Sequence, residues 1–466
     1  MDQLPVELLC MIFDWLDLNS IKNASLACHR WERIIFSNHY IKRFTFRSLL
    51  SNNSTKHEMK QMARLMKVSH RCYPNLKLEF DHQSEYTEHA FHVLFRSMSC
   101  RMLDQLVVLK LVLTAFPDLM LQMVFNAVPE MSRLAALHLM VGNRPCQLDE
   151  RRYKYELHLK SDSLRYLELK AFLPGSLNLP LLKSLDMSLH MQAEMIYSCH
   201  RHLGEEMLYS AHFENLEELT FSQPSSSGDG VVRMKLTNRP GYKLRFYQQL
   251  TRLKTLRLLE DKTSECIFQA ICESCTSLTE LHIECLQIVD PNAPRHLSKL
   301  PHLRRLTLNS FVAPAPISFE STNLPHLEHL RLGRGSFAYD SFHAFGAVLS
   351  LALALTQAKH SGETMRAIAQ HLPNVTVLRL NLEALGDLDA SALLHSLHLL
   401  TGVRELVLEG GYFHASTCEP NTPPMPELQK LHFRHYRMHS RELPWLRRMF
   451  PNLALLDIRQ CPAVPN

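Results

Sequence analysis

The sequence has little glycine, no strong net charge and no long apolar run. Only 14 of its 466 residues are glycine, too few for a collagen-like or glycine-rich repeat. The 51 basic and 46 acidic residues leave a net charge of +5, which does not by itself argue for a nucleic-acid ligand. No uninterrupted apolar stretch approaches the ~18 residues of a membrane span. With 46% hydrophobic and 21% charged residues, the composition favours a folded chain over a disordered one.

The first residues also lack a secretory signal. Residues 1–7 are acidic and have neither a basic region nor a long apolar segment. The 12 cysteines are scattered along the chain. Without an export signal, we expect them to be reduced thiols in a protein of the cytoplasm, the nucleus or both.

Leucine is abundant, and its placement is periodic. An apolar residue recurs at positions 1, 4 and 6 of a unit, and the residue three places before position 1 is apolar in every unit except one, where it is Ser161. Heptads do not fit, because proline and polar residues interrupt every long stretch. The units start at Leu106, Leu134, Leu164, Leu182, Leu216, Leu253, Leu278, Leu303, Leu327, Val348, Val375, Val403, Leu428 and Leu453.

From Leu253 onward the starts are 21 to 28 residues apart. Positions 4 and 6 alternate as in a strand, so both side chains point to one face. A unit this short cannot bury that face alone, whereas stacked units can. The pattern resembles leucine-rich repeats. The resemblance implies an α/β solenoid over residues 101–462, with about 14 irregular repeats, parallel strands on its concave face and helices, such as one over 266–272, on its convex face.

Two segments depart from this pattern. Residues 222–241 are rich in serine, glycine and proline, and we expect a flexible exposed loop there. Residues 47–100 lack the repeat, and we interpret them as a linker and N-terminal capping region. Within that region, Leu76–Phe80 alternates like a strand.

Residues 1–46 form a different module, with helical rather than strand spacing. A first helix is expected after Leu4-Pro5, a second after an N-cap at Asn19-Ser20, and a third around Trp31. So short a segment cannot enclose all of its apolar side chains, and we expect some of them to face a partner. The module resembles an F-box in the order and spacing of Leu4-Pro5, Glu7-Leu8-Leu9, Ile12-Phe13, Leu16-Asp17 and Cys28-His29-Arg30-Trp31.

The F-box resemblance implies a Skp-type adaptor as partner, which would connect the chain to a cullin–RING ubiquitin ligase. The alternative for each apolar residue is packing inside the helical module, and for Trp31 the two interpretations are evenly matched. By resemblance, the residues that bind the adaptor or support its binding are Leu4, Pro5, Leu8, Leu9, Ile12, Phe13, Leu16 and Trp31.

Three patterns suggest other chemistry, but each has a simpler explanation. Cys266, Cys272, Cys275 and Cys285 resemble a zinc quartet, yet Cys275 occupies a core position of the repeat. His432, His435 and His439 lie partly on a strand and have no evident carboxylate partners. Residues 333–338 imitate a dinucleotide-binding loop, but no acidic residue ends the next strand. We predict no catalytic residue, metal or cofactor, and therefore no enzyme.

The outward positions of the predicted strands carry many basic residues in the second half of the chain. They form either a solvated charged face or a basic stripe that binds an acidic or phosphorylated segment of a target protein. Nucleic acid and anionic cofactors are weaker alternatives. The candidate target-binding residues are Arg257, His282, Arg305, Arg331, Arg379 and Arg434.

Three functional hypotheses follow. The first is a target-recognition subunit of an SCF-type (Skp–cullin–F-box) ubiquitin ligase, acting in protein degradation without bond chemistry of its own. The second is an interaction scaffold that does not lead to degradation. The third is a GTPase regulator, which would need an exposed arginine acting on a nucleotide and would leave the F-box unexplained. No membrane partner is expected.

Overall fold

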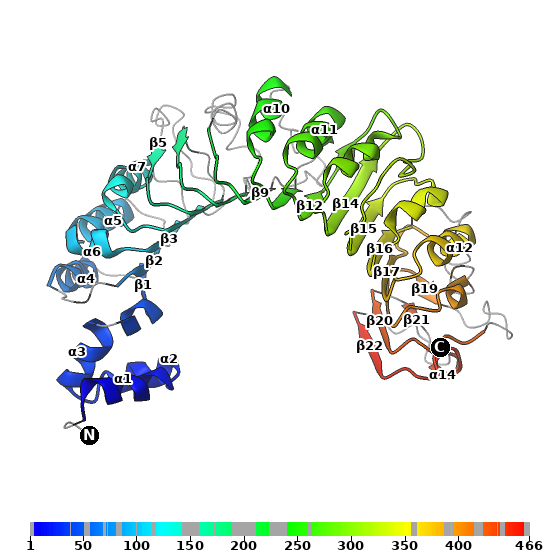
Figure 1. Ribbon diagram of the computed structural model, residues 1–466. Coiled ribbons are helices and arrows are strands. Elements are labelled where there is room, and N and C mark those ends of the chain that lie inside the picture. The colour runs from blue at the N-terminus through cyan, green and yellow to red at the C-terminus, as the bar shows by residue number, and fades with distance from the viewer. Residues whose placement is uncertain are drawn as a thin grey trace. The chain divides into compact units, whose positions relative to one another are not determined.

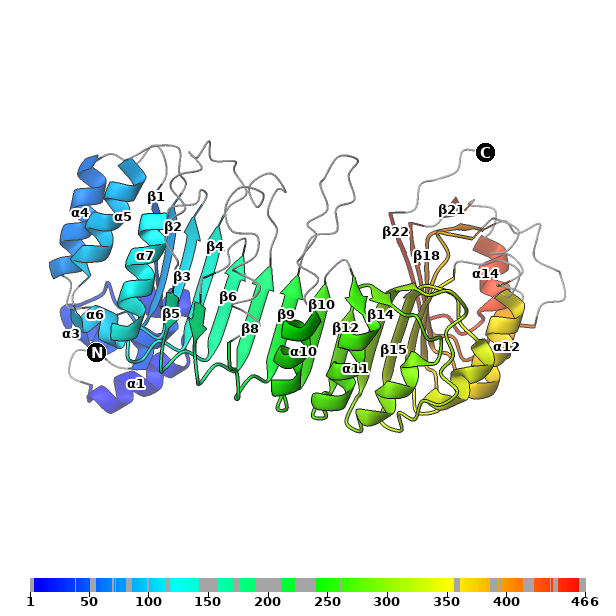
Figure 2. The ribbon, with the colours of Figure 1, turned by 90° about the horizontal axis from the view of Figure 1, so that it is seen from above.

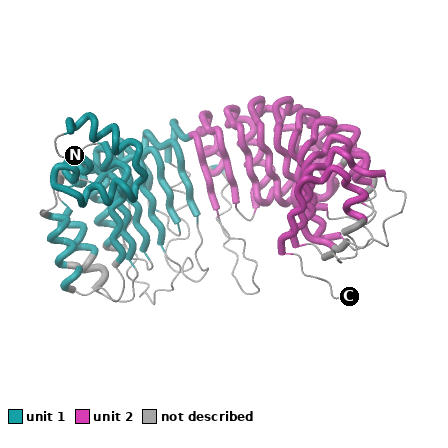
Figure 3. Tube along the Cα trace, turned by 90° about the horizontal axis from the view of Figure 1, so that it is seen from below, with its two compact units in different colours: residues 1–216, 226–242 teal, residues 217–225, 243–466 magenta. Residues whose placement is uncertain are grey.

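The computed structural model divides the chain into two compact units, which are described separately. Unit 1 comprises residues 1–216 and 226–242, and unit 2 comprises residues 217–225 and 243–466 (Figure 3). The residues that the structure describes are 4–37, 39–50, 56–68, 71, 73–80, 86–98, 100–113, 118–141, 158–170, 174, 176–188, 211–222, 240–259, 262–355, 361–385, 393, 396–413, 423–435, 437–438 and 443–460.

Unit 1 begins with three short helices: α1 (Val6–Asp14), α2 (Leu18–Ala24) and α3 (His29–Ser37), followed by the 3₁₀ turn η1 (His39–Arg43). The three predicted helices are confirmed. The predicted N-cap at Asn19-Ser20 is wrong, because Asp17 caps α2 and accepts a hydrogen bond from the Ser20 amide at 2.7 Å. The small core of this module contains Leu9, Phe13, Ile21, Ile34, Ile35, Tyr40 and Phe44.

The rest of unit 1 is a parallel sheet with helices on one face (Figures 1 and 2). Each strand pairs with the next in the order β1 (Thr45–Leu50), β2 (Asn75–Phe80), β3 (Val108–Leu113), β4 (Ala136–Val141), β6 (Tyr166–Lys170) and β8 (Ser184–Ser188). The helical elements are α4 (Lys56–Val68), α5 (Tyr86–Ser97), α6 (Cys100–Gln105), α7 (Asp118–Ala127) and the turn η2 (Val128–Glu130). Two short strands, β5 (His158–Lys160) and β7 (Ser176–Asn178), form a separate parallel pair.

Unit 2 has the same architecture. Its sheet is curved, and its helices lie on the outer, convex side (Figure 1). Its parallel strands are β9 (Glu218–Ser222), β10 (Thr255–Leu259), β12 (Glu280–Ile283), β14 (Arg305–Val312), β15 (His329–Arg334), β16 (Ser350–Ala354), β17 (Val377–Asn381), β18 (Glu405–Glu409), β20 (Lys430–Arg434) and β22 (Leu455–Arg459). The outer elements are α10 (Pro240–Gln249), α11 (Glu265–Ser274), η3 (Ala293–Lys299), η4 (Tyr339–Phe345), α12 (Ser361–His371), η6 (Leu397–Leu399) and α14 (Leu443–Met449). Four short strands also pair in parallel: β11 (Thr263–Ser264) with β13 (Leu286–Gln287), and β19 (Tyr412–Phe413) with β21 (Arg437–Met438).

Every predicted repeat start precedes a strand by two residues, as Leu303 precedes β14. Positions 4 and 6 are buried in every unit except the last, as Leu306 and Leu308 are, whereas Leu456 and Ile458 of the last unit are exposed. Ser161, the one polar residue found three places before position 1, is buried as well. Its hydroxyl accepts a hydrogen bond from the Leu164 amide at 3.2 Å. The predicted α/β leucine-rich-repeat solenoid is therefore confirmed, including the predicted helix over 266–272, which lies within α11.

The sheet begins earlier than the predicted start at residue 101. β1 and β2 pair in parallel, and β2 pairs with β3, so both lie in the segment predicted as linker and cap. The apolar pattern missed β1 because its inward position is Ser48, which is 2% exposed and donates a hydrogen bond to Met62 Sδ at 2.9 Å. Of the predicted loop 222–241, Ser222 belongs instead to β9 and Pro240 begins α10, and residues 223–239 lie outside the described part.

Candidate docking surfaces

One side of α1 is apolar and exposed. Leu8, Met11, Ile12 and Trp15 follow the i, i+3, i+4, i+7 spacing that places side chains on one helix face. Trp15 is 90% exposed and Met11 60%. We call these four residues the docking face. Exposed Val6, Leu18 and Leu26 belong to the same helical module.

The adjacent positions on α1 face inward instead. Leu9 and Phe13 are fully buried. The Phe13 ring meets the rings of Trp31 and Tyr40 edge to face, with centroid distances of 5.5 and 5.9 Å. The hydroxyl of Tyr40 donates to the Cys10 carbonyl at 2.6 Å and to Asp14 Oδ1 at 2.9 Å, and burial raises its pKa. These contacts fix the orientation of α1 and turn the docking face outward.

The eight residues predicted to serve adaptor binding therefore separate into three groups. Pro5, Leu8 and Ile12 are exposed. Leu9 and Phe13 are core residues, which can support the docking face but cannot contact a partner from where they lie. Sequence reasoning missed Met11 and Trp15, which the helical spacing counted from Leu8 would have found. The remaining three, half-buried and packed against the core, are Leu4, Leu16 and Trp31.

The closing Cys-x-x-Trp pattern has a local structural role. Cys28 directly precedes α3, and its Sγ lies 3.5 Å from the backbone nitrogen of Trp31. The thiol thus meets a backbone N–H in the first turn, as an N-cap side chain does. Arg30, between them, donates to the Leu4 carbonyl at 2.6 Å and ties α3 to the start of α1.

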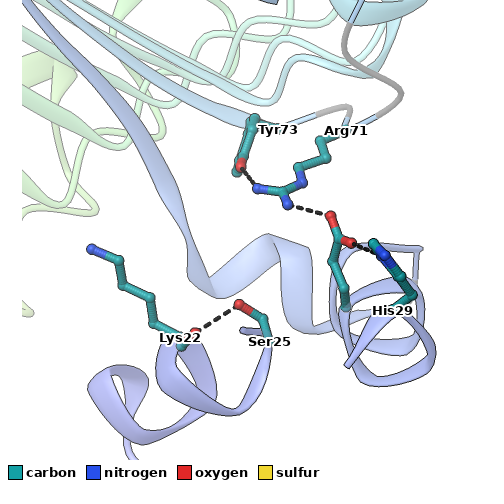
Figure 4. Close-up of polar contacts among 6 residues, drawn as sticks. Lys22, Ser25, His29, Arg71 and Tyr73 are labelled. Atoms are coloured by element: carbon teal, nitrogen blue, oxygen red, sulfur yellow. Dashed lines mark hydrogen bonds and ion pairs between the residues drawn. The ribbon is translucent and has the colours of Figure 1, made fainter. Parts of the chain in front are cut away.

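A polar junction joins the helical module to the repeats within unit 1 (Figure 4). Arg71, just before β2, forms an ion pair with Glu32 of α3, and its Nη1 lies 3.4 Å from the Tyr73 hydroxyl. The guanidinium also stacks 4.0 Å above the centre of the Phe36 ring. Asn75 Nδ2 donates to the Lys42 carbonyl at 2.8 Å. The helical module is therefore anchored to the first strands through several contacts.

We predict that this junction weakens in acid. Hydrogen bonds from Arg71 and then from His29 hold the pKa of Glu32 below its ordinary value of 4.5. A lowered pKa in the folded state adds stability that is complete above that ordinary value and is lost as the pH falls through the folded-state pKa. Glu32→Gln should therefore lower the unfolding temperature near about pH 7, and the difference from wild type should shrink as the pH falls below the ordinary value of 4.5.

Thermal unfolding followed by circular dichroism across that range measures this prediction. The exposed Glu320 in unit 2, replaced by glutamine, is the matched control. A Glu32→Gln deficit that persists unchanged in acid would contradict the assignment.

In unit 2, one row of outward residues runs across the concave face in strand register. It contains Thr220, Arg257, His282, Thr307, Arg331, Ala352, Arg379, Val407 and His432, in strand order from β9 to β20. None of these nine residues is acidic, but Val407 is buried and the next residue of the row, on β22, is Asp457. The row therefore aligns four of the six candidate target-binding residues, whereas Arg305 and Arg434 lie in the rows on either side.

Part of this basic charge is already neutralised. Arg257 Nη2 lies 2.8 Å from Glu280 Oε1, and Arg305 Nη1 lies 3.9 Å from the other oxygen of that carboxylate. His282 is half-buried, and burial, assisted by the charges of Arg257 and Arg331, holds its pKa below the ordinary value. His282 is therefore mainly neutral at neutral pH.

Arg331, Arg379 and Arg434 are exposed. Within the described ranges, no ion pair is found for any of the three. Unlike Arg257, none of the three has a carboxylate within ion-pair distance in the described part of the chain, and Glu409 lies beside Arg434 in the strand register.

The alternative sites do not assemble in the described residues, where no three His, Cys, Asp or Glu side chains are placed to hold a metal ion. Cys272 and Cys275 are buried, and burial raises the pKa of Cys275 to about 12. His432 lies 3.2 Å from Asp457 Oδ2, so it does have a carboxylate partner; His439 lies outside the described residues. Gly333 lies in the segment that imitates a dinucleotide-binding loop, and it approaches the Asn309 backbone too closely for a side chain.

None of the described helices has the length and apolar character needed to cross a membrane.

Residues 1–47 match the F-box-like family model. The match is confined to the helical module, and the strands that follow it carry the leucine-rich-repeat pattern, so the chain resembles F-box/leucine-rich-repeat proteins. An F-box generally indicates binding of a Skp-type adaptor, and proteins of this family are typically non-catalytic.

Among solved structures, the chain is similar to a leucine-rich-repeat protein of Leptospira interrogans, with 11% identity, a TM-score of 0.35, and coverage of 88% of this chain and 99% of that one. It is also similar to TLR13 in its complex with ssRNA13, with 15% identity, a TM-score of 0.37, and coverage of 91% and 63%. No curated protein matches the chain.

Proposed function

We propose that the chain is the target-recognition subunit of an SCF-type ubiquitin ligase in the cytoplasm, the nucleus or both. Its F-box would bind a Skp-type adaptor through the docking face, and the concave face of unit 2 would hold a target protein. The chain would break no bond itself. It would raise the effective concentration of a target lysine near a ubiquitin-charged enzyme.

The exposed docking face is the observation that carries this proposal. A core lies directly beneath α1, yet the large side chains of Met11 and Trp15 remain in solvent. Contiguous exposed apolar side chains typically mark a protein interface, and tryptophan is enriched among the residues that contribute most to binding. The junction through Arg71 would then hold the bound adaptor in a defined position against the first strands of unit 1.

The basic residues of unit 2 support the second half of the proposal. Arg257, His282, Arg305, Arg331, Arg379 and Arg434 lie on one concave face. Repeat proteins use this kind of extended surface for binding, and arginine suits acidic or phosphorylated partners because its planar fork pairs with two oxygens.

The proposal is tested by comparing the proteins bound to the tagged wild-type chain in cells with and without proteasome inhibition. We expect a subset of bound proteins to accumulate on inhibition, because degradation then stops after capture. The same proteins should accumulate without the inhibitor on a variant with Leu8 and Ile12 replaced by aspartate, which would bind targets but not the adaptor. Bound proteins whose amounts do not respond in either experiment would instead favour the non-degradative scaffold.

A further inference from the structure

Two arginines flank a strand whose outward residues are small on the concave face of unit 2. In strand register, Arg331 on β15 is adjacent to Ala352 on β16, which is adjacent to Arg379 on β17. Two strand spacings separate the arginine Cα atoms by about 10 Å. Because the outward residues of β16 are only Ser350, Ala352 and Ala354, no large side chain separates the two guanidinium groups.

The surrounding charges leave this pair available. Glu280 is engaged by Arg257 and Arg305 on the preceding repeats, and Glu405, one strand beyond Arg379, lies 3.7 Å from Lys430 Nζ. Glu409 on that same strand lies beside Asn381 in the register, and no ion pair to Arg379 is found within the described ranges.

We propose that Arg331 and Arg379 form a clamp for the phosphate of a phosphorylated side chain on the target protein, seated above Ala352. A phosphate carries a charge of about −1.5 to −2 at neutral pH and three acceptor oxygens, which matches two guanidinium forks. A carboxylate carries one charge, and a single arginine satisfies both of its oxygens. The clamp rests on the proposed function, since it specifies the ligand of the target-binding face.

The test uses the full chain, purified with its adaptor, and two fluorescent pools of degenerate peptides that differ only in a central phosphoserine or serine. Fluorescence polarisation should show at least about tenfold tighter binding of the phosphoserine pool, equivalent to one strong charge-assisted contact. Arg331→Gln and Arg379→Gln should each lose most of this preference, and the double variant should lose all of it.

The matched control replaces Arg447 and Arg448, which are exposed on α14, so the same charge is removed elsewhere in unit 2. This control should keep the phosphoserine preference, and all variants should unfold at the wild-type temperature. The clamp is refuted by a wild type that does not prefer phosphoserine, by a double variant that keeps the preference, or by a control that loses it equally. Displacement of the bound pool by single-stranded RNA at lower concentrations than by free phosphoserine peptide would also refute it.

The same preparations separate this failure from failure of the proposed function. If the wild-type chain retains its adaptor but shows no phosphoserine preference, only the clamp is wrong. If the chain binds no Skp-type adaptor, the proposed function fails whatever the peptides show.

Discussion

Replacing Leu8 and Ile12 together with aspartate is expected to abolish adaptor binding without unfolding the chain. Both side chains are exposed on α1, so the fold does not depend on them, whereas a partner covering the docking face would have to bury two carboxylates. Two interface residues of this kind are worth about 2 kcal/mol each, so affinity should fall by about a thousandfold. Isothermal titration with a purified Skp-type adaptor measures the effect.

Two controls make the result specific. Leu65→Asp removes an exposed leucine of α4, outside the F-box, and should bind the adaptor as wild type does. Leu9→Asp places a charge in the F-box core and should unfold the module, with loss of helical signal. If the Leu8 and Ile12 variant binds normally, the docking face is assigned to the wrong surface.

Gly333→Ala is expected to destabilise unit 2 by about 3 kcal/mol, at the upper end of ordinary overpacking. A Cβ on Gly333 would lie 1.6 Å from the carbonyl oxygen of Asn309 on the neighbouring strand. Because backbone blocks the position, no side-chain rotation relieves the clash, and β14 and β15 must move apart. Chemical denaturation should show the loss as a lower midpoint.

The matched control is Gly346→Ala in the same unit. A Cβ at Gly346 meets no atom within 4 Å, so this change should leave stability unchanged or raise it by up to about 1 kcal/mol. Equal stability of the two alanine variants would contradict the close strand contact at Gly333.

The strands were predictable because the information that places them is local. Each repeat start fixes two inward residues by spacing alone, and all fourteen predicted units contain a strand. The sequence pattern did not predict β1, because Ser48 stands at an inward position where the other strands have an apolar residue. A hydrogen bond from Ser48 to Met62 makes a polar residue tolerable there. A polar side chain with a buried partner looks in sequence like a solvent-exposed one.

The docking face was only partly predictable for a different reason. Leu8 and Leu9 are neighbours of the same type, and only the packing of Phe13 against Tyr40 and Trp31 shows which one faces inward. Met11 and Trp15 were missed, although their i+3 and i+7 spacing from Leu8 places them on the same face of α1. On the concave face, the sequence identified the arginines, but only the structure shows that Arg257 shares Glu280 with Arg305 while Arg331 does not.

Hydrogen exchange of the wild-type chain, with and without a saturating Skp-type adaptor, tests the central claim most directly. Docking through the F-box predicts slower exchange on adaptor binding in α1 and in the turn containing Leu26, with no change in the strands of unit 2. The absence of a stable complex, or protection confined to the concave face of unit 2 with none in α1, would contradict the account.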